Sequence, residues 1–199
     1  MSRIGIMGGT FDPLHWAHLI IAEESREKFN LGKVIFIPAG QPPHKLTYPV
    51  SDAEHRYAMT LLGTASNPYF EVSRLEIERS GPSYSVDTIR EIKGIYGRKT
   101  EIYFIVGADE ILEIESWHEA DQLPKLTRFI VAPRPGFDLT ALEQHLPLKF
   151  LKSIEILPIA PVDISATNLR TRIATGKTIR YLVPEEVEQY IHKHGLYLE

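Results

Sequence analysis

The sequence predicts an α/β fold in which a mainly parallel sheet has helices on both faces. Short apolar runs that suit buried strands occur at residues 4–7, 34–37, 102–106, 129–131 and 154–157. Segments with apolar residues at helical spacing lie between these runs. Strands that alternate with helices are typical of parallel sheets, because each parallel connection needs a crossover that is usually a helix.

The remaining elements follow in chain order. Helical spacing predicts helices over residues 16–29, 53–65, 86–96, 109–114 and 139–146. In residues 70–77, apolar and polar side chains alternate for most of the segment, and we expect a further strand there. Two more helices are predicted in the tail, over residues 168–174 and 185–194. Gly195 follows the last of these, at the position where a glycine commonly ends a helix.

Composition limits the class of protein. The chain has 199 residues and is 43% apolar, which suits one well-buried core, so residues 1–199 are expected to form a single domain. Its C-terminal helical part is expected to begin near residue 165. The chain has no cysteine, so it cannot use a thiol nucleophile or a thiolate zinc site, and a reducing cytoplasm fits. No membrane association is expected, since no apolar run approaches spanning length, and a net charge of -4 argues against a nucleic-acid partner.

A glycine turn with two histidines follows the first predicted strand. Residues 8–18 read Gly-Gly-Thr-Phe-Asp-Pro-Leu-His-Trp-Ala-His and open the first predicted helix. The N-terminus of a helix presents unpaired N–H groups and a positive dipole end, so it binds phosphate well. Pro13 suits a first helical turn, so we expect the helix to begin near it. His15 and His18 would then project from one face toward the same ligand.

Several loops are expected at the same edge of the sheet. The turn at Gly8, the proline-rich loop around Pro42 and the residue Gly107 all follow predicted strands. In parallel sheets of this kind, ligands bind at the carboxyl ends of the strands, where the strand order reverses. The sequence therefore predicts a phosphate-binding cleft at that edge.

These motifs resemble the nucleotidyltransferase superfamily related to class I tRNA synthetases. The resemblance rests on Gly-Gly-Thr-Phe-Asp-Pro-x-His-x-x-His at 8–18 and on Ile-Ser-x-Thr-x-Leu-Arg at 164–170. Three further segments are similar to those of bacterial nicotinate mononucleotide adenylyltransferases. They are Pro-Pro-His-Lys at 42–45, Gly-Pro-Ser-Tyr-Ser-Val-Asp-Thr at 81–88, and Gly-Ala-Asp at 107–109 followed by Ser-Trp at 116–117. The resemblance covers essentially the whole chain and implies one Rossmann-like nucleotidyltransferase domain.

The resemblance also implies a reaction and its partners. The adenylyl group of ATP would pass to nicotinate mononucleotide, giving nicotinic acid adenine dinucleotide and pyrophosphate in NAD biosynthesis in the cytoplasm. ATP and nicotinate mononucleotide would be the partners, and the sequence leaves open a homo-oligomer. Mg²⁺ would be bound through the substrate phosphates, with no metal site built by the protein itself.

The family pattern assigns roles to individual residues. The catalytic residues would be His15, His18 and Arg170. The ATP-binding residues would be Gly8, Gly9, Thr10, Phe11, Gly107, Asp109, Ile164, Ser165 and Thr167, with Asp109 at a ribose. The mononucleotide-binding residues would be Lys45, Ser85, Trp117, His118 and Arg134. Trp117 would stack on the pyridine ring, and the Ser85 hydroxyl and the N–H of residue 118 would receive the carboxylate.

Other readings stay open on the residues alone. A sister nucleotidyltransferase could act on pantetheine phosphate or nicotinamide mononucleotide, although Trp117 and residues 83–85 argue against it. A non-catalytic nucleotide-binding module could keep the fold without the reaction. His15 and His18 could be a capping pair, or could bind zinc or iron with Asp12 or Asp109 as in a hydrolase, although the spacing does not indicate three converging ligands. A lone tryptophan commonly fills the core, and residues such as Ser165 commonly cap helices.

Overall fold

The centre of the molecule is a parallel sheet, seen in a computed structural model that describes residues 3–43, 50–133, 136–138, 140–160 and 162–198. The strands are β1 (Arg3–Gly9), β2 (Lys33–Pro38), β3 (Phe70–Val72), β4 (Glu101–Gly107), β5 (Arg128–Ala132) and β6 (Ile154–Ile156). Within the described residues, six strands are hydrogen-bonded in the order β3-β2-β1-β4-β5-β6. Every pairing is parallel, which confirms the predicted sheet.

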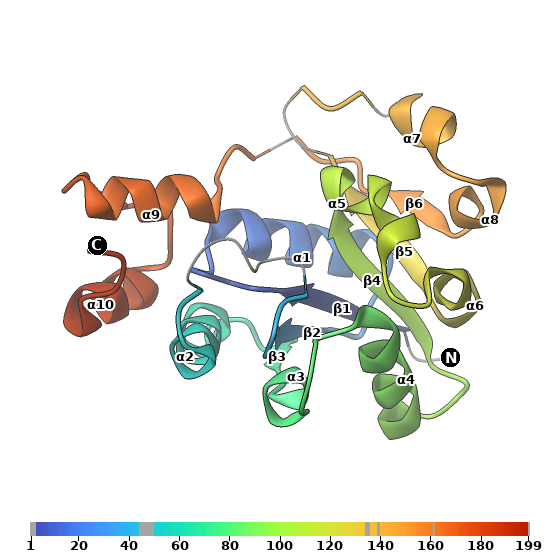
Figure 1. Ribbon diagram of the computed structural model, residues 1–199, viewed down its shortest axis with the longest axis horizontal. Helices are drawn as coiled ribbons and strands as arrows, with labels where there is room; N and C mark the ends of the chain where they lie inside the picture. The colour runs from blue at the N-terminus through green and yellow to red at the C-terminus, as the bar shows by residue number, and fades with distance from the viewer. Residues whose placement is uncertain (1–2, 44–49, 134–135, 139, 161, 199) are drawn as a thin grey trace.

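Helices connect the strands and surround the sheet (Figure 1). The longer helices are α1 (Trp16–Lys28), α2 (Ala53–Thr64), α4 (Ser85–Tyr96), α9 (Ala166–Ala174) and α10 (Glu185–His194). The shorter ones are α3 (Leu75–Glu78), α5 (Ala108–Leu112), α6 (Leu123–Leu126), α7 (Thr140–His145) and α8 (Leu148–Leu151). Two 3-10 turns, η1 (Ile114–Ser116) and η2 (Ala120–Gln122), lie between α5 and α6. None of the described helices is long and apolar enough to cross a membrane.

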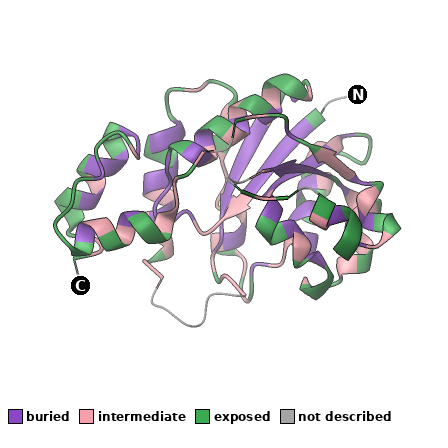
Figure 2. Cartoon of the chain, turned by 90° about the horizontal axis from the view of Figure 1, so that it is seen from above, coloured by how far each residue is buried: buried purple, intermediate pink, exposed green. Residues whose placement is uncertain are grey.

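Side chains of the central strands alternate between two buried faces. In β4, Ile102, Phe104 and Val106 join a core that also contains residues of α4 to α8. Tyr103 and Ile105 point the other way and join a core with α1. Figure 2 shows the buried residues concentrated in the strands, with exposed residues on the outer sides of the helices. Because both faces are covered, the strands are nearly continuous apolar runs, and the predicted helices on both faces are confirmed.

The strand order reverses at β1, which places a binding edge there. β1 lies between β2 and β4, and the chain continues outward from it in both directions. Gly9 and Pro38 are register partners at the ends of β1 and β2, and Gly107 and Ala132 are partners at the ends of β4 and β5. The loops that follow these strands therefore leave from one edge, at the reversal where ligands bind in such sheets.

The C-terminal helices form a third core with α2. Leu169 and Ile173 of α9 and Val187 of α10 pack with Met59 of α2. Gly195 ends α10 with φ at +60°, which confirms the predicted glycine stop. This packing attaches the segment that carries the late motif to the first part of the chain.

One predicted strand is shorter than expected. Residues 70–77 are predicted as one strand, but it ends at Val72 and α3 follows. The backbone N–H of Ser73 still donates to the carbonyl of Phe36 at 2.9 Å, while its hydroxyl oxygen accepts the backbone N–H two residues later at 3.2 Å. Such a local bond favours a turn over a continued strand. As a result, Glu76 lies in a helical turn and is buried.

Candidate active site

Two cavities lie next to each other along the carboxyl edge of the sheet. The first has a volume of about 260 Å³ and is bordered by the ends of β1 and β4, the start of α1 and the segment before α9. The second has a volume of about 440 Å³ and is bordered by the loops after β1 and β2, the start of α4 and residues of α5 and η1. Both are lined by Gly8, Gly9, Thr10 and Glu110. The cavities therefore share a wall, and together they form a divided cleft.

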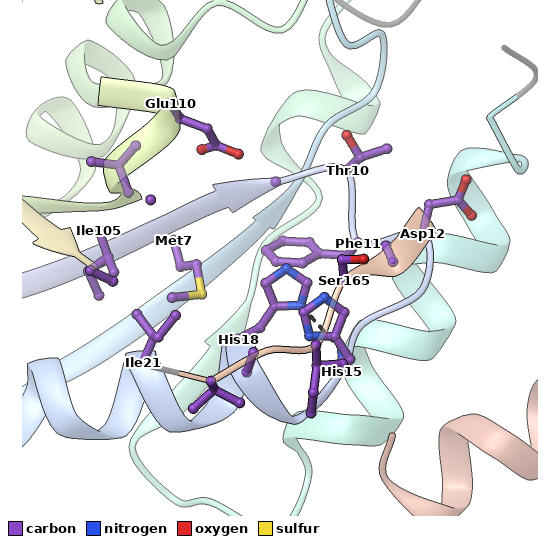
Figure 3. Close-up of a pocket in the computed structure, with 18 of the residues that line it drawn as sticks. Met7, Thr10, Phe11, Asp12, His15, His18, Ile21, Ile105, Glu110 and Ser165 are labelled. Atoms are coloured by element: carbon purple, nitrogen blue, oxygen red, sulfur yellow. Dashed lines mark hydrogen bonds between the residues drawn. The ribbon is translucent and has the colours of Figure 1, made fainter. Parts of the chain in front are cut away.

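The first cavity brings together the two predicted motifs from opposite ends of the sequence (Figure 3). The predicted residues that line it are Gly8, Gly9, Thr10, Phe11, His15, His18, Gly107, Ile164, Ser165, Thr167 and Arg170. Only the fold makes these segments neighbours, because β1 leads into one of them and α9 begins in the other.

His15 and His18 stack on each other at the first cavity. Their ring centroids are 3.8 Å apart and their planes differ by 22°, and the ring of Phe11 meets His18 edge-on at 5.1 Å. The backbone N–H of His15 donates to Nδ1 of His18 at 3.3 Å. Because Nδ1 accepts this bond, we assign the proton of neutral His18 to Nε2. His18 therefore has an N–H donor even when it is uncharged.

Helix α1 begins at Trp16, which confirms the start of the range predicted from helical spacing but not the start expected near Pro13. We expect it to start near Pro13, but its first residue is Trp16, and His15 is the N-cap with an extended backbone (φ −146°, ψ 170°). The physical reason is that Asp12 is held by a distant residue, since its carboxylate accepts the hydroxyl of Tyr197 at 2.6 Å. The prediction of a helix from Pro13 is wrong. His15 therefore caps α1, and His18 is the third residue of the helix.

The late motif forms the start of α9. Ser165 is the N-cap, and its Oγ accepts the backbone N–H of Asn168 at 3.3 Å, so the predicted helix N-terminus in this motif is confirmed. Nη1 of Arg170 donates to the carbonyl of Asp12 at 2.7 Å, and Nη2 donates to Oγ1 of Thr167 at 3.3 Å. A helix N-terminus and a guanidinium thus border the same cavity, which favours an anion there.

The second cavity has aromatic walls. Ser85 is the first residue of α4, and Trp117 follows η1 with its ring edge-on to Phe104 at 6.0 Å. His118 stacks on Tyr84 with a centroid distance of 4.1 Å and an angle of 21°. All five residues line this cavity. Flat aromatic walls beside a hydroxyl group suit a planar ring with a polar substituent.

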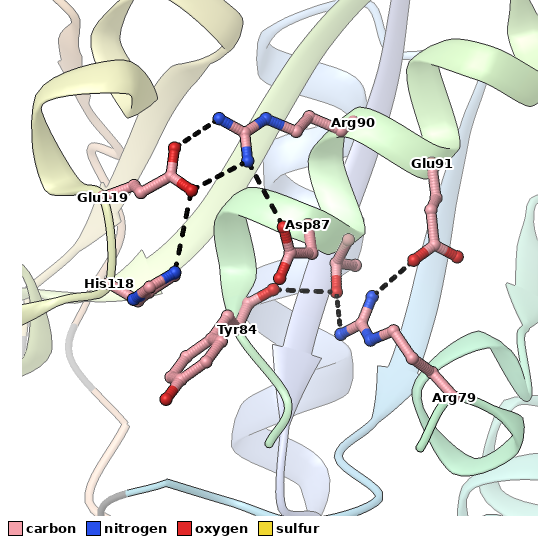
Figure 4. A network of polar contacts seen from close by, with 8 residues as sticks. Arg79, Tyr84, Asp87, Arg90, Glu91, His118 and Glu119 are labelled. Atoms are coloured by element: carbon pink, nitrogen blue, oxygen red, sulfur yellow. Dashed lines mark hydrogen bonds and ion pairs between the residues drawn. The ribbon is translucent and has the colours of Figure 1, made fainter. Parts of the chain in front are cut away.

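Ion pairs brace the rim of the second cavity (Figure 4). Arg90 on α4 lies 3.3 Å from Asp87 and 2.5 Å from Glu119, and Nε2 of His118 lies 3.7 Å from Glu119. Hydrogen bonding to Arg90 lowers the pKa of the Glu119 carboxyl. Single surface pairs contribute little to stability. Together these contacts connect residues 118 and 119 to α4.

Glu76 lines the second cavity and is not singled out by the sequence. It is 6% exposed, and its carboxylate accepts the hydroxyl of Thr88 and lies 3.9 Å from Arg79. Burial raises the pKa of this carboxyl group. The sequence carried no signal that Glu76 is buried, because a charged residue in a strand of alternating apolar and polar side chains is expected to face solvent.

The other predicted residues lie in different places. Asp109 is predicted to bind ATP, and it lines the second cavity, whereas Gly107 lines the first. Lys45 and Arg134 lie outside the described residues. Glu110, which no sequence motif singles out, lines both cavities. Its position one residue after Asp109, in the first turn of α5, was the available signal.

Residues 6–172 match the family model described as cytidylyltransferase-like, which assigns the chain to the nucleotidyltransferases, and the fold and the divided cleft agree with that class. A protein of Moorella thermoacetica named "Probable nicotinate-nucleotide adenylyltransferase" is 54% identical over 199 residues, which cover 98% of this chain and 92% of that protein. A protein of Thermoanaerobacter sp. with the same name is 50% identical over 98% of this chain and 94% of its own length. The chain therefore belongs to the family of nicotinate-nucleotide adenylyltransferases.

Solved structures agree with the Rossmann-like fold. Nicotinic acid mononucleotide adenylyltransferase of Plasmodium falciparum, complexed with NaAD, is similar with a TM-score of 0.82 at 21% identity, over 100% of both chains. The same protein complexed with APC gives a TM-score of 0.79 at 20% identity, again over 100% of both chains. At this level of identity the likeness concerns the fold, which confirms the predicted class.

Proposed function

We propose that this chain transfers the adenylyl group of ATP to nicotinate mononucleotide, as a cytoplasmic step of NAD biosynthesis. A phosphate oxygen of the mononucleotide attacks the α-phosphorus of ATP. The bond from that phosphorus to the oxygen bridging the β-phosphorus breaks, so pyrophosphate leaves and nicotinic acid adenine dinucleotide forms.

The observation that carries the proposal is the wall at residues 8–10, which a donor-rich cavity and an aromatic cavity share. Two substrates bound on its two sides would meet there. The family relation supports the same reaction.

We assign the first cavity to ATP. The mononucleotide phosphate is largely ionised at neutral pH, because the second pKa of such a phosphate is about 6, so the attack needs no general base. The protein instead aligns two anions and stabilises the charge that grows on the α-phosphate and on the leaving pyrophosphate. His15, His18 and Arg170 are the donors proposed for this task. Ser165 and Thr167, at the start of α9, are proposed to hold the β- and γ-phosphates.

We assign the second cavity to nicotinate mononucleotide. Trp117 is proposed to stack on the pyridine ring, while the Ser85 hydroxyl and the backbone N–H of His118 receive the carboxylate. Donors at this position favour a carboxylate over a carboxamide, whose own N–H groups would meet other donors. Asp109 is proposed to accept a hydroxyl of a ribose. Lys45 and Arg134 are proposed for the mononucleotide phosphate on the family pattern.

Mg²⁺ bound through the substrate phosphates completes the proposal. Among the residues described, no three His, Cys, Asp or Glu side chains gather in a way that could hold a metal ion. Mg²⁺ is commonly held by substrate phosphates together with one or two carboxylates, so this arrangement fits. Glu110 lines both cavities and is the carboxylate proposed to contribute. When bound, Mg²⁺ neutralises part of the phosphate charge.

Pyrophosphate release from ATP and Mg²⁺ tests the proposal, with three acceptors assayed in parallel. We expect kcat/KM with nicotinate mononucleotide to exceed that with nicotinamide mononucleotide by roughly 100-fold or more, because unpaired donors and acceptors are costly in a closed pocket. Equal use of acid and amide would refute the carboxylate pocket and keep the transfer. Pyrophosphate release with pantetheine phosphate as the only active acceptor would mean that the protein is a sister nucleotidyltransferase. ATP binding without release would indicate a non-catalytic module.

A further inference from the structure

A buried arginine outside both cavities connects the loops that form them. Arg56 lies on α2 and is 1% exposed, and among the described residues it lines neither cavity. Its guanidinium donates to three backbone carbonyls: Nε to Ser51 at 2.8 Å, Nη1 to Thr10 at 3.0 Å and Nη2 to Gly40 at 3.3 Å. We infer that Arg56 is a positioning residue that fixes the first cavity, proposed for ATP, and the second cavity, proposed for the mononucleotide, relative to each other. This inference rests on the proposed function.

The three carbonyls belong to segments that are far apart in the sequence. Thr10 follows β1 and lines both cavities. Gly40 follows β2 and lies between Ala39 and Pro42, which line the second cavity. One planar group therefore fixes the shared wall against the outer wall of the mononucleotide cavity. The three donor atoms, Nε, Nη1 and Nη2, form a planar fork. A lysine ammonium is a point donor on a flexible stem and does not reproduce this fork.

Asp12 extends the connection to the phosphate-binding side. The residue is 2% exposed, and its carboxylate accepts the hydroxyl of Tyr197 at 2.6 Å and the backbone N–H of Ser51 at 3.2 Å. Its carbonyl accepts Nη1 of Arg170 at 2.7 Å. Burial lowers the pKa of Arg56, and the negative charge of Asp12 opposes that shift. Asp12 and Arg56 therefore hold Ser51 from both of its backbone groups.

Adenylyl transfer depends on how the two substrates are placed relative to each other. A misplacement of about 1 Å can cost about 100-fold in rate. The residues proposed to bind the triphosphate lie at the caps and in the first two turns of α1 and α9, whereas the loop after β2 is fixed by Arg56 at Gly40. Loss of the fork should therefore impair mononucleotide use and turnover more than it impairs binding of ATP.

The test compares Arg56→Lys with Arg172→Lys. The first variant keeps the positive charge that faces Asp12 and removes the fork. The second is a matched control, because Nε of Arg172 donates to the carbonyl of Thr178 at 2.7 Å, and Arg172 lines neither cavity among the described residues. For each protein, steady-state kinetics give kcat and the KM for nicotinate mononucleotide. Calorimetry gives the Kd for an ATP analogue with a methylene bridge between the α- and β-phosphorus atoms, which cannot be cleaved.

For Arg56→Lys we expect KM for the mononucleotide to rise at least about tenfold and kcat to fall at least about tenfold, with the analogue Kd within about threefold. Arg172→Lys should match the unaltered protein in all three. Unchanged kinetics in Arg56→Lys would overturn the inference. A lower melting temperature with normal KM and kcat per folded molecule, or an equal loss of affinity for both substrates, would reduce Arg56 to a structural role.

A second variant keeps the inference testable if Arg56→Lys does not fold. Tyr197→Phe removes only the hydroxyl that Asp12 accepts. Because Asp12 and Arg56 hold Ser51 together, we expect KM for the mononucleotide to rise and kcat to fall by about three- to tenfold, and normal kinetics would refute the inference. If the unaltered protein released no pyrophosphate, the proposed function would fail. The inference would then be judged by calorimetry alone, with weaker mononucleotide binding to the analogue complex of the variant as the expected result.

Discussion

Replacing Gly40 by alanine is expected to destabilise the protein and to weaken its use of the mononucleotide. A Cβ at this position would lie 2.2 Å from the carbonyl oxygen of Glu76 and 3.2 Å from Cα of Ile77. A carbon and an oxygen approach each other to about 3.3 Å, so the two segments would have to separate by about 1 Å. The obstacle is backbone, so no side-chain rotation can relieve it.

The magnitude follows from this clash. Overpacking of this kind costs about 1–3 kcal/mol in free energy of unfolding. For a chain of this size, 1 kcal/mol lowers Tm by about 2–4 °C, so Gly40→Ala should lower Tm by roughly 2–12 °C. The same displacement would move the carbonyl that Arg56 holds at 3.3 Å. We therefore expect KM for nicotinate mononucleotide to rise while binding of the ATP analogue is kept.

Thermal unfolding followed by circular dichroism checks the prediction, with Gly94→Ala as the matched control. Gly94 lies in α4, and nothing lies within 4 Å of a Cβ placed there. Alanine at an open helical position should stabilise the protein by about 0.5–1 kcal/mol. If Gly40→Ala melted at the same temperature as the unaltered protein while Gly94→Ala gained stability, the argument from the close backbone contact would be refuted.

Three further predictions concern single side chains of the cleft. His18→Ala should lower kcat at least about 100-fold with the ATP analogue bound almost normally, because a donor to the developing charge is lost. Kinetics and calorimetry check this beside a control variant, His192→Ala, whose side chain is exposed on α10, and full turnover would remove His18 from the mechanism. Glu76→Gln should raise Tm at pH 8, and this gain should vanish below about pH 4. The sign follows because burial raises the pKa of Glu76, so stability present in the protonated state is lost as the pH rises through the folded pKa. Melting curves across that range check it, and a pH-independent difference would contradict it. Ser85→Ala should lower kcat/KM for nicotinate mononucleotide about 10- to 100-fold and barely change that for nicotinamide mononucleotide, which parallel assays compare. Equal losses on both substrates would argue against the carboxylate contact.

The central strands could be predicted because they are buried on both faces. Residues 102–106 are apolar throughout, and the fold covers their two alternating sets of side chains with different helices. Short elements gave no such signal, since α6 and α8 have four residues each, about one helical turn. Helical spacing placed the start of α1 correctly at residue 16, whereas the start expected near Pro13 was wrong, since Asp12 is held by Tyr197, a contact that no local pattern contains.

The candidate site was predictable where its residues stand in contiguous motifs. The segments at 8–18 and 164–170 can be recognised from their residue types and their order, and the fold brings both to one cavity. Glu76 and Arg56 carry no local signal, because their surroundings come from other segments. A charged residue on a predicted helix is ordinarily solvated. Only the packing of α2 against the loops after β1 and β2 makes Arg56 a buried donor to both.

The position of Arg56 follows from how a parallel sheet ends. Thr10 and Gly40 lie beyond Gly9 and Pro38, the last paired residues of β1 and β2, so their carbonyls need donors from elsewhere. A guanidinium supplies several donors in one plane, so a single side chain can serve both loops and the carbonyl of Ser51. An apolar replacement would leave all three carbonyls without this partner, and would mix lost stability with lost alignment. The lysine variant keeps charge and part of the donor capacity, so it is the change that separates the two effects.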